Sequence, residues 1–297
     1  MSMSSAELIF DGKQGTGESP VWLPEEQALY WVDIPAKRIW CWVASTAATR
    51  SWLLPEKVGC IAHVNGNKWL AAMETGVFSV TLNSDDSVNT ALLAKANHAS
   101  TNMRFNDGRC DRQGRFLAGT MFMDMAAAKA VGAVSVFAAN GAQRQLFDQM
   151  IVPNGMAFSP DGQTMYLSDS HPSVQLIWAF DYDTATGTPT NKRVFVDMNP
   201  LPGRPDGAAV DGDGCYWICG NDAGLIHRFT PKGKLDRSLA VPVKKPAMCA
   251  FGGENLDTLF VTSIRPGGVD LSDQPLAGGV FALRPGVSGI AEPKFIA

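Results

Sequence analysis

The 297 residues carry a formal net charge of −4, and 45% of them are hydrophobic, which can fill a large core and predicts a single domain over residues 1–297. The densest basic pair away from the termini is Lys244-Lys245, so we expect no nucleic-acid partner. No basic segment precedes an apolar stretch at the N-terminus, and no run of about 18 apolar residues occurs, so we expect a cytoplasmic protein without a membrane partner. The oligomeric state is left open.

Glycine, proline and tryptophan number 29, 18 and 8 residues, which suits many short strands joined by tight turns and argues against a helical bundle. The six cysteines include no CxxC pair, and Cys215, Trp217 and Cys219 alternate as one face of a strand would. We therefore expect buried free thiols, with disulfides as the alternative.

The predicted strands form a repeat that occurs six times. Each copy has a short apolar strand, a polar turn, a β-rich second strand, an apolar third strand and a less regular fourth strand. The copies follow one another at intervals of roughly 40 to 50 residues, the size of a propeller blade. In chain order, the second strands are expected at residues 30–33, 69–72, 116–119, 166–169, 216–219 and 259–262.

This repeat predicts an all-β fold, a six-bladed β-propeller with four antiparallel strands in each blade. The alternative, a β-sandwich, would not require a sixfold match of turns and strands. A further β-rich segment, AELIF from Ala6, precedes the first repeat and can supply the outer strand of the last blade, which would close the ring.

The first residues of the six innermost strands should meet in a ring at one end of the central channel. Four of the six positions have oxygen-bearing side chains, and glycine lies next to or near three of them. The predicted ring consists of Glu18, Val58, Asn106, Asn154, Asp206 and Ala247.

Two carboxylates and two amides converging with no lysine or arginine in the ring would be costly to desolvate, so we expect one bound divalent metal cation. Oxygen ligands favour Ca²⁺, Mg²⁺ or Mn²⁺, while Zn²⁺ and iron stay open. The alternative is that these are turn residues whose side chains bond the nearby backbone.

No nucleophile elbow, phosphate-binding loop or HExxH motif occurs. Among the histidines, only His171, at a strand end, is a candidate for either a loop or a pocket wall.

Several short motifs occur together over nearly the whole chain. They are GESP (17–20), YWVD (30–33), RFNDG (104–108), GRFLAGTM (114–121), PNG (153–155), SPDG (159–162), PDG (205–207) and LAGGVFALRPGVSGIAEPKF (276–295). In this order they resemble the senescence marker protein, regucalcin and gluconolactonase family. The resemblance implies a six-bladed propeller with one catalytic metal in its channel.

Carried over by matching motif, the resemblance implies that Glu18, Asn154 and Asp206 bind the metal, and that Asn106 lies beside it and contacts the substrate or a metal-bound water. It further implies that Arg104 binds sugar-lactone oxygens; from the residues alone, Arg104 reads as a solvated arginine at a strand end. The family often has a substrate-contacting acid shortly after its GTM motif. Here Asp124 is the nearest acid, which suggests an altered substrate rim.

These expectations combine into a metal-dependent lactonase that hydrolyses an aldonolactone, such as a glucono- or pentonolactone, to the free acid. Asp206 would be the catalytic general base, while Arg104 and Asn106 would orient the sugar hydroxyls. Two alternatives are a calcium-binding regulatory protein of the regucalcin type and a phosphotriesterase-like propeller hydrolase.

Overall fold

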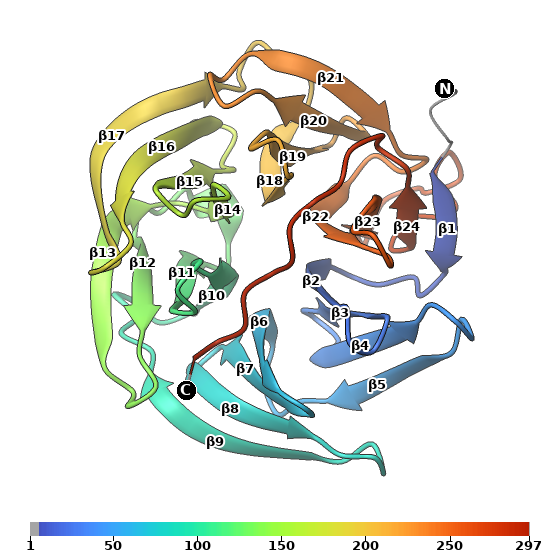
Figure 1. Ribbon diagram of the computed structural model, residues 1–297, viewed down its shortest axis with the longest axis horizontal. Helices are drawn as coiled ribbons and strands as arrows, with labels where there is room; N and C mark the ends of the chain where they lie inside the picture. The colour runs from blue at the N-terminus through green and yellow to red at the C-terminus, as the bar shows by residue number, and fades with distance from the viewer. Residues whose placement is uncertain (1–5, 297) are drawn as a thin grey trace.

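The computed structural model describes residues 6–296, which form six four-stranded antiparallel sheets arranged in a ring (Figure 1). The predicted six-bladed β-propeller is therefore confirmed. The only helical element among the described residues is a 3₁₀ turn, η1 (Met125–Ala127), in blade 3.

The four strands of each blade follow one another from the channel to the outer surface. From the inside outwards, blade 1 consists of β2 (Gly17–Leu23), β3 (Ala28–Asp33), β4 (Arg38–Val43) and β5 (Thr49–Leu53), and blade 2 of β6 (Val58–Asn65), β7 (Lys68–Met73), β8 (Gly76–Leu82) and β9 (Val88–Lys95). Blade 3 consists of β10 (Met103–Cys110), β11 (Phe116–Phe122), β12 (Gly132–Phe137) and β13 (Gln143–Met150), and blade 4 of β14 (Pro153–Phe158), β15 (Thr164–Asp169), β16 (Leu176–Asp183) and β17 (Thr188–Asp197). Blade 5 consists of β18 (Arg204–Val210), β19 (Tyr216–Asn221), β20 (Leu225–Phe229) and β21 (Leu235–Ala240), and blade 6 of β22 (Pro246–Gly252), β23 (Thr258–Ser263), β24 (Val280–Leu283) and β1 (Glu7–Phe10).

Blade 6 is completed by the beginning of the chain, as the segment from Ala6 predicted. Glu7 pairs with Ala282 and Leu8 pairs with Phe281, so β1 covers the outer edge of β24. The first described strand is thus hydrogen-bonded to the last one. This pairing closes the circle of blades, because the start and the end of the chain share one sheet.

The apolar core is divided among the six contacts between neighbouring blades, each of which holds one cluster of buried side chains. Aromatic rings bridge several of these contacts: the ring centroids of Tyr30 and Trp69 are 4.6 Å apart, and those of Trp22 and Phe260 are 5.2 Å apart. All residues of the inner strands β14 and β22 are buried. This explains why the innermost strands read as apolar or small, since both faces of each pack against another blade.

Every innermost strand has an irregularity in its pairing at or directly after the ring position. In blade 4, Asn154 pairs with Ser168 but Ala157 pairs with Tyr166, so one extra residue is accommodated on β14. Gly155, inside this bulge, has a φ of 61°, and a Cβ there would lie 2.5 Å from the Tyr216 hydroxyl. Such a bulge redirects neighbouring side chains, here at the channel mouth.

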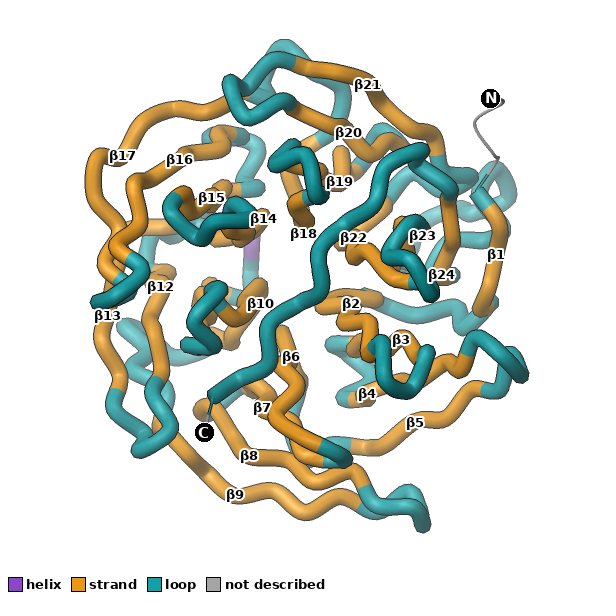
Figure 2. Tube along the Cα trace, viewed as in Figure 1, coloured by secondary structure: helices purple, strands orange, loops and turns teal. Residues whose placement is uncertain are grey.

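The C-terminal segment, residues 284–296, follows the last strand and crosses one end of the channel (Figures 1 and 2). It contacts the turns that follow the innermost strands: the Ile296 amide donates to the Gly114 carbonyl, and the Gly212 amide donates to the Ser288 carbonyl. Phe295 is buried in the cluster between blades 2 and 3. Because the ring positions are at the beginnings of the inner strands, they lie at the opposite end of the channel.

All six cysteines are buried and unpaired, which confirms the expected free thiols. Within the described residues, no helix has the length and apolar character needed to cross a membrane.

Candidate metal centre

The six predicted ring residues come from six different blades, one from each innermost strand. Val58 and Ala247 are fully buried, whereas the four polar members lie on β2, β10, β14 and β18. Asn154 is 4% exposed and Asp206 is 8% exposed, so these polar groups are largely removed from solvent. The propeller thereby gathers residues remote in the sequence at one channel mouth.

Both carboxyl groups in this ring have raised pKa values. Burial raises the pKa of Asp206 to about 7, although the positive charge of Arg204 and a hydrogen bond from Asn221 act in the opposite direction. Burial, followed by the negative charges of Asp206 and Asp107, raises the pKa of Glu18 well above its ordinary value. Glu18 and Asp206 therefore lie close enough to repel each other, and a bound cation would relieve this repulsion.

Three oxygen atoms of the ring make no hydrogen bond to any described residue: Oε1 of Glu18, Oδ1 of Asn154 and Oδ1 of Asp206. The other polar atom of Asn154, Nδ2, donates to the Ser170 hydroxyl at 2.6 Å, and Oδ2 of Asp206 accepts from Asn221 at 2.6 Å. Oε2 of Glu18 accepts only a long bond of 3.4 Å from the Ser19 amide.

This donor set, two carboxylates and one amide, fits a hard divalent cation such as calcium, magnesium or manganese. No group of three or more His, Cys, Asp or Glu side chains that could hold a metal occurs among residues 6–296. The candidate centre does not fit that pattern, because one of its three predicted ligands, Asn154, is an amide. The metal ligands, like the other site roles, remain predictions.

Arg104 and Asn106, both on β10, are brought together as their spacing predicted. NH1 of Arg104 donates to Oδ1 of Asn106 at 2.9 Å and to the Phe105 carbonyl at 2.7 Å. Nδ2 of Asn106 donates to the Pro153 carbonyl at 3.1 Å, so both polar atoms of this amide are engaged. This arrangement suits Asn106 for a place beside the metal better than for metal ligation.

The Arg104 side chain is half-buried at the channel mouth. Burial lowers its pKa, while the negative charges of Glu18, Glu74 and Asp206 act against that shift. Among the described residues, Arg104 donates hydrogen bonds through Nη1 only. Its Nε and Nη2 are therefore available to a ligand. The nearby acids favour a role for Arg104 in the site over that of a solvated arginine at a strand end, and both readings remain predictions.

Asp124 and His171 lie in the loops of neighbouring blades. Asp124 is exposed and caps η1, its Oδ1 accepting from the Ala126 amide at 3.1 Å. Nε2 of His171 lies 3.2 Å from the Met125 carbonyl, and its Nδ1 lies 2.7 Å from the Ser173 hydroxyl. His171 therefore has a loop role, connecting blade 4 to the segment that carries Asp124, whose expected contact with substrate remains a prediction.

Sequence reasoning did not single out Ser170, Asn221 or Asp107, all of which are buried next to ring residues. Asp107 accepts from the Met156 amide at 2.9 Å, and burial raises its pKa. A comparison of the six second strands at the points where they end would have drawn attention to Ser170 and Asn221.

The far end of the channel is closed by the C-terminal segment. Arg109 and Glu292 form an ion pair of 3.0 Å there, and NH2 of Arg109 donates to the Ala208 carbonyl at 2.7 Å. The remaining hollow between these groups and Met248 has a volume of only about 20 Å³, roughly the space of one water molecule. We therefore expect a substrate to approach the ring from the opposite face.

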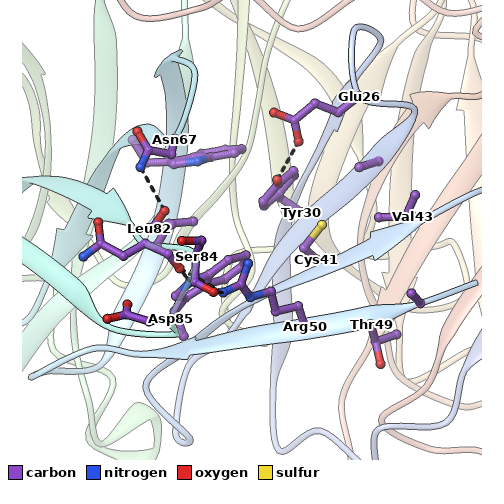
Figure 3. A pocket seen from close by; sticks show the side chains of 15 residues that line it. Glu26, Tyr30, Cys41, Val43, Thr49, Arg50, Asn67, Leu82, Ser84 and Asp85 are labelled. Carbon is purple, nitrogen blue, oxygen red and sulfur yellow. Dashed lines mark hydrogen bonds between the residues drawn. The ribbon is translucent and has the colours of Figure 1, made fainter.

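A larger groove of about 910 Å³ opens away from the ring, between the outer parts of blades 1 and 2 (Figure 3). Tyr30 donates to Glu26 at 2.7 Å on one side, and Arg50 binds the backbone carbonyl of Ser84 on the other. Arg50 also forms an exposed ion pair with Asp86. The Arg50 contacts join blade 1 to blade 2, and none of the ring residues lines this groove.

The fold and the ring define a class of six-bladed propellers with an oxygen-lined site at one end of the channel. Residues 16–265 match the family model described as SMP-30/Gluconolactonase/LRE-like region, and the chain belongs to this family. It is 38% identical over 281 residues to a 6-deoxy-6-sulfogluconolactonase of Pseudomonas putida, with 94% of each chain covered. It is 32% identical over 302 residues to regucalcin of Xenopus laevis, with 99% of each chain covered.

A solved structure of regucalcin from Agrobacterium tumefaciens, described as a calcium-binding protein, superimposes with a TM-score of 0.91. The match covers 99% of this chain and 98% of that one at 26% sequence identity. The family resemblance inferred from the motifs is thus confirmed.

Proposed function

We propose that this protein is a metal-dependent lactonase that opens a sugar lactone to the free acid. The observation that carries the proposal is the set of three free oxygens, on Glu18, Asn154 and Asp206, beside the Arg104–Asn106 pair. The name of the Pseudomonas relative supports a lactone of a sugar acid as substrate, and the description of the Agrobacterium structure supports a divalent metal.

Glu18, Asn154 and Asp206 would hold the cation, which when bound supplies Lewis acidity to the lactone carbonyl oxygen. Arg104 would bind hydroxyl groups of the sugar through Nε and NH2, and Asn106 would keep that guanidinium in place. Since the C-terminal segment covers the other end of the channel, the lactone ring would enter from the side of these residues.

Asp206 is the proposed general base. As the oxygen of a water molecule forms a bond to the carbonyl carbon, Asp206 accepts the proton that this water loses. The bond between that carbon and the ring oxygen then breaks, and the ring oxygen leaves as a hydroxyl after taking the proton back from Asp206. Water is consumed and no other co-reactant is needed.

A panel of lactones tests this function by acid release, with chelator-treated protein supplemented by one divalent ion at a time. We expect sugar lactones to be cleaved faster than simple esters, because hydroxyl contacts contribute to transition-state binding. Full turnover by metal-free protein would exclude the metal-dependent mechanism.

The second candidate is a calcium-binding regulatory protein, which the names of the regucalcin relatives favour. Tight calcium binding without turnover of any lactone, whichever metal is added, would support that candidate over the enzyme.

A further inference from the structure

Ser170 and Asn221 occupy the same position in two neighbouring blades. In blade 4, Pro153 precedes the ring residue Asn154 and pairs with Asp169, the residue before Ser170. In blade 5, Pro205 precedes the ring residue Asp206 and pairs with Gly220, the residue before Asn221. Each polar side chain therefore lies at the end of the second strand, at the level of a predicted metal ligand.

The Ser170 hydroxyl connects Asn154 to the next blade. It accepts a hydrogen bond of 2.6 Å from Nδ2 of Asn154 and donates one of 2.5 Å to the Pro205 carbonyl. Because the carbonyl can only accept, the single hydroxyl proton is used there, and the group facing Ser170 must be the NH₂ of Asn154. This fixes the orientation of the amide and leaves its Oδ1 for the channel.

Asn221 makes the corresponding contacts in blade 5. Its Nδ2 donates to Oδ2 of Asp206 at 2.6 Å and to the Pro246 carbonyl at 3.3 Å. Its Oδ1 lies 3.3 Å from NH2 of Arg204 and 3.5 Å from Nζ of Lys245. Two positively charged donors at Oδ1 determine which end of the amide faces Asp206. One carboxylate oxygen is thus engaged and the other is left free.

The other blades do not repeat this arrangement. The equivalent position holds an apolar side chain in blades 1, 3 and 6 and an exposed threonine in blade 2, namely Ile34, Met121, Ile264 and Thr75. A buried polar side chain therefore occurs at this position only in the two blades that provide Asn154 and Asp206. It thus accompanies two of the three proposed ligands, whereas the blade that provides Glu18 has Ile34 at this position.

We propose that Ser170 and Asn221 are positioning residues that turn the free oxygens of Asn154 and Asp206 towards the metal. This inference rests on the proposed metal centre. Neither residue is itself a proposed ligand; each acts through the one hydrogen bond that it makes to a ligand. Loss of such an outer hydrogen bond typically lowers metal affinity 10- to 100-fold.

The test compares Ser170→Ala and Asn221→Leu with Ser263→Ala as a matched control. Ser263 is also buried at the end of a second strand, and its hydroxyl donates to the Gly279 carbonyl at 2.7 Å without contacting a ring residue. Calcium and, separately, manganese are titrated calorimetrically into chelator-treated full-length protein. We expect Kd to rise about tenfold or more in the two test variants and to stay within about twofold in the control.

Stability is measured in the same metal-free samples, since all three substitutions remove buried hydrogen bonds. Ser170→Thr keeps the hydroxyl and should restore affinity to within about threefold of the parent. If Asn221→Leu does not fold, Asn221→Ala replaces it.

Unchanged Kd values in Ser170→Ala and the Asn221 variant would overturn the inference, as would an equal loss of affinity in Ser263→Ala. If the parent protein binds neither ion, the proposed metal centre fails and this inference fails with it. Because the readout is ion binding, an absence of lactone turnover alone would count against the proposed enzyme and not against the positioning role.

Discussion

Arg104 and Asn106 form one hydrogen-bonded unit, in which NH1 of the arginine lies 2.9 Å from Oδ1 of the amide. The amide is in turn tied to blade 4 through the Pro153 carbonyl. A guanidinium held by one nitrogen keeps a defined orientation while its other donors point to a ligand. We therefore expect the loss of activity on replacing Arg104 to depend strongly on whether the substrate has hydroxyl groups.

Arg104→Lys should lower kcat/KM for sugar lactones about tenfold or more, equivalent to roughly 1.4 kcal/mol, because lysine keeps the charge but loses the fork. Turnover of an unsubstituted small lactone should change much less, and Kd for the metal should stay near the parent value. Steady-state kinetics on both substrates, with calorimetry for the metal, checks this. Equal losses on the two lactones would mean that Arg104 supports the site and does not contact sugar.

Asp206→Asn should reduce kcat more than Asn154→Ala does when both are measured at saturating metal. The first change keeps the shape but removes a charge and the proposed base, whereas the second removes a neutral ligand and should act mainly on metal affinity. Rates at increasing metal concentration separate the two effects. Parent-like kcat in Asp206→Asn would remove Asp206 as the general base.

Metal binding should release protons at low pH. In metal-free protein the pKa values of Asp206, about 7, and of Glu18 are raised, mainly by burial. These raised values stabilise the metal-free fold at low pH, and the contribution is lost as pH rises from the ordinary carboxyl pKa of about 4 through about 7. Below about pH 7 a cation must displace these bound protons, so its affinity should rise with pH and level off above that value.

Calorimetry in two buffers of different ionisation enthalpy measures this release directly. We expect about one proton or more per bound ion near pH 6 and far fewer near pH 8. The urea midpoint of chelated protein should fall over the same interval. Proton release that does not change with pH would show that these carboxyls do not control ion binding.

The C-terminal segment should contribute to stability through its buried charge. Glu292→Ala leaves Arg109, only 5% exposed at its side chain, without its carboxylate partner, and should cost about 3 kcal/mol of unfolding free energy. Lys294→Ala is the control on the same segment: its ion pair with Glu25 is exposed, so the loss should stay below about 1 kcal/mol. Urea unfolding followed by tryptophan fluorescence compares the two variants, and similar losses would contradict the proposed importance of the buried pair.

The propeller, the closing of blade 6 by the segment from Ala6, and the ring positions could all be predicted from the amino-acid sequence. These features depend on local patterns: strand periodicity and turn residues recur in each blade, so counting from the turns locates Glu18, Asn154 and Asp206 at equivalent places. The spacing of Arg104 and Asn106 likewise placed both on one strand.

Which atoms of these residues remain free could not be predicted, because it depends on contacts formed in the folded protein. Asn154 donates to Ser170, and Asn221 donates to Asp206. Ser170 and Asn221 are themselves oriented by hydrogen bonds to the carbonyls of Pro205 and Pro246, which belong to the following blades. The raised pKa of Asp206 depends on burial by the assembled ring. Such effects arise from distances between residues remote in sequence, which periodicity does not encode, because they exist only when neighbouring blades pack around the channel.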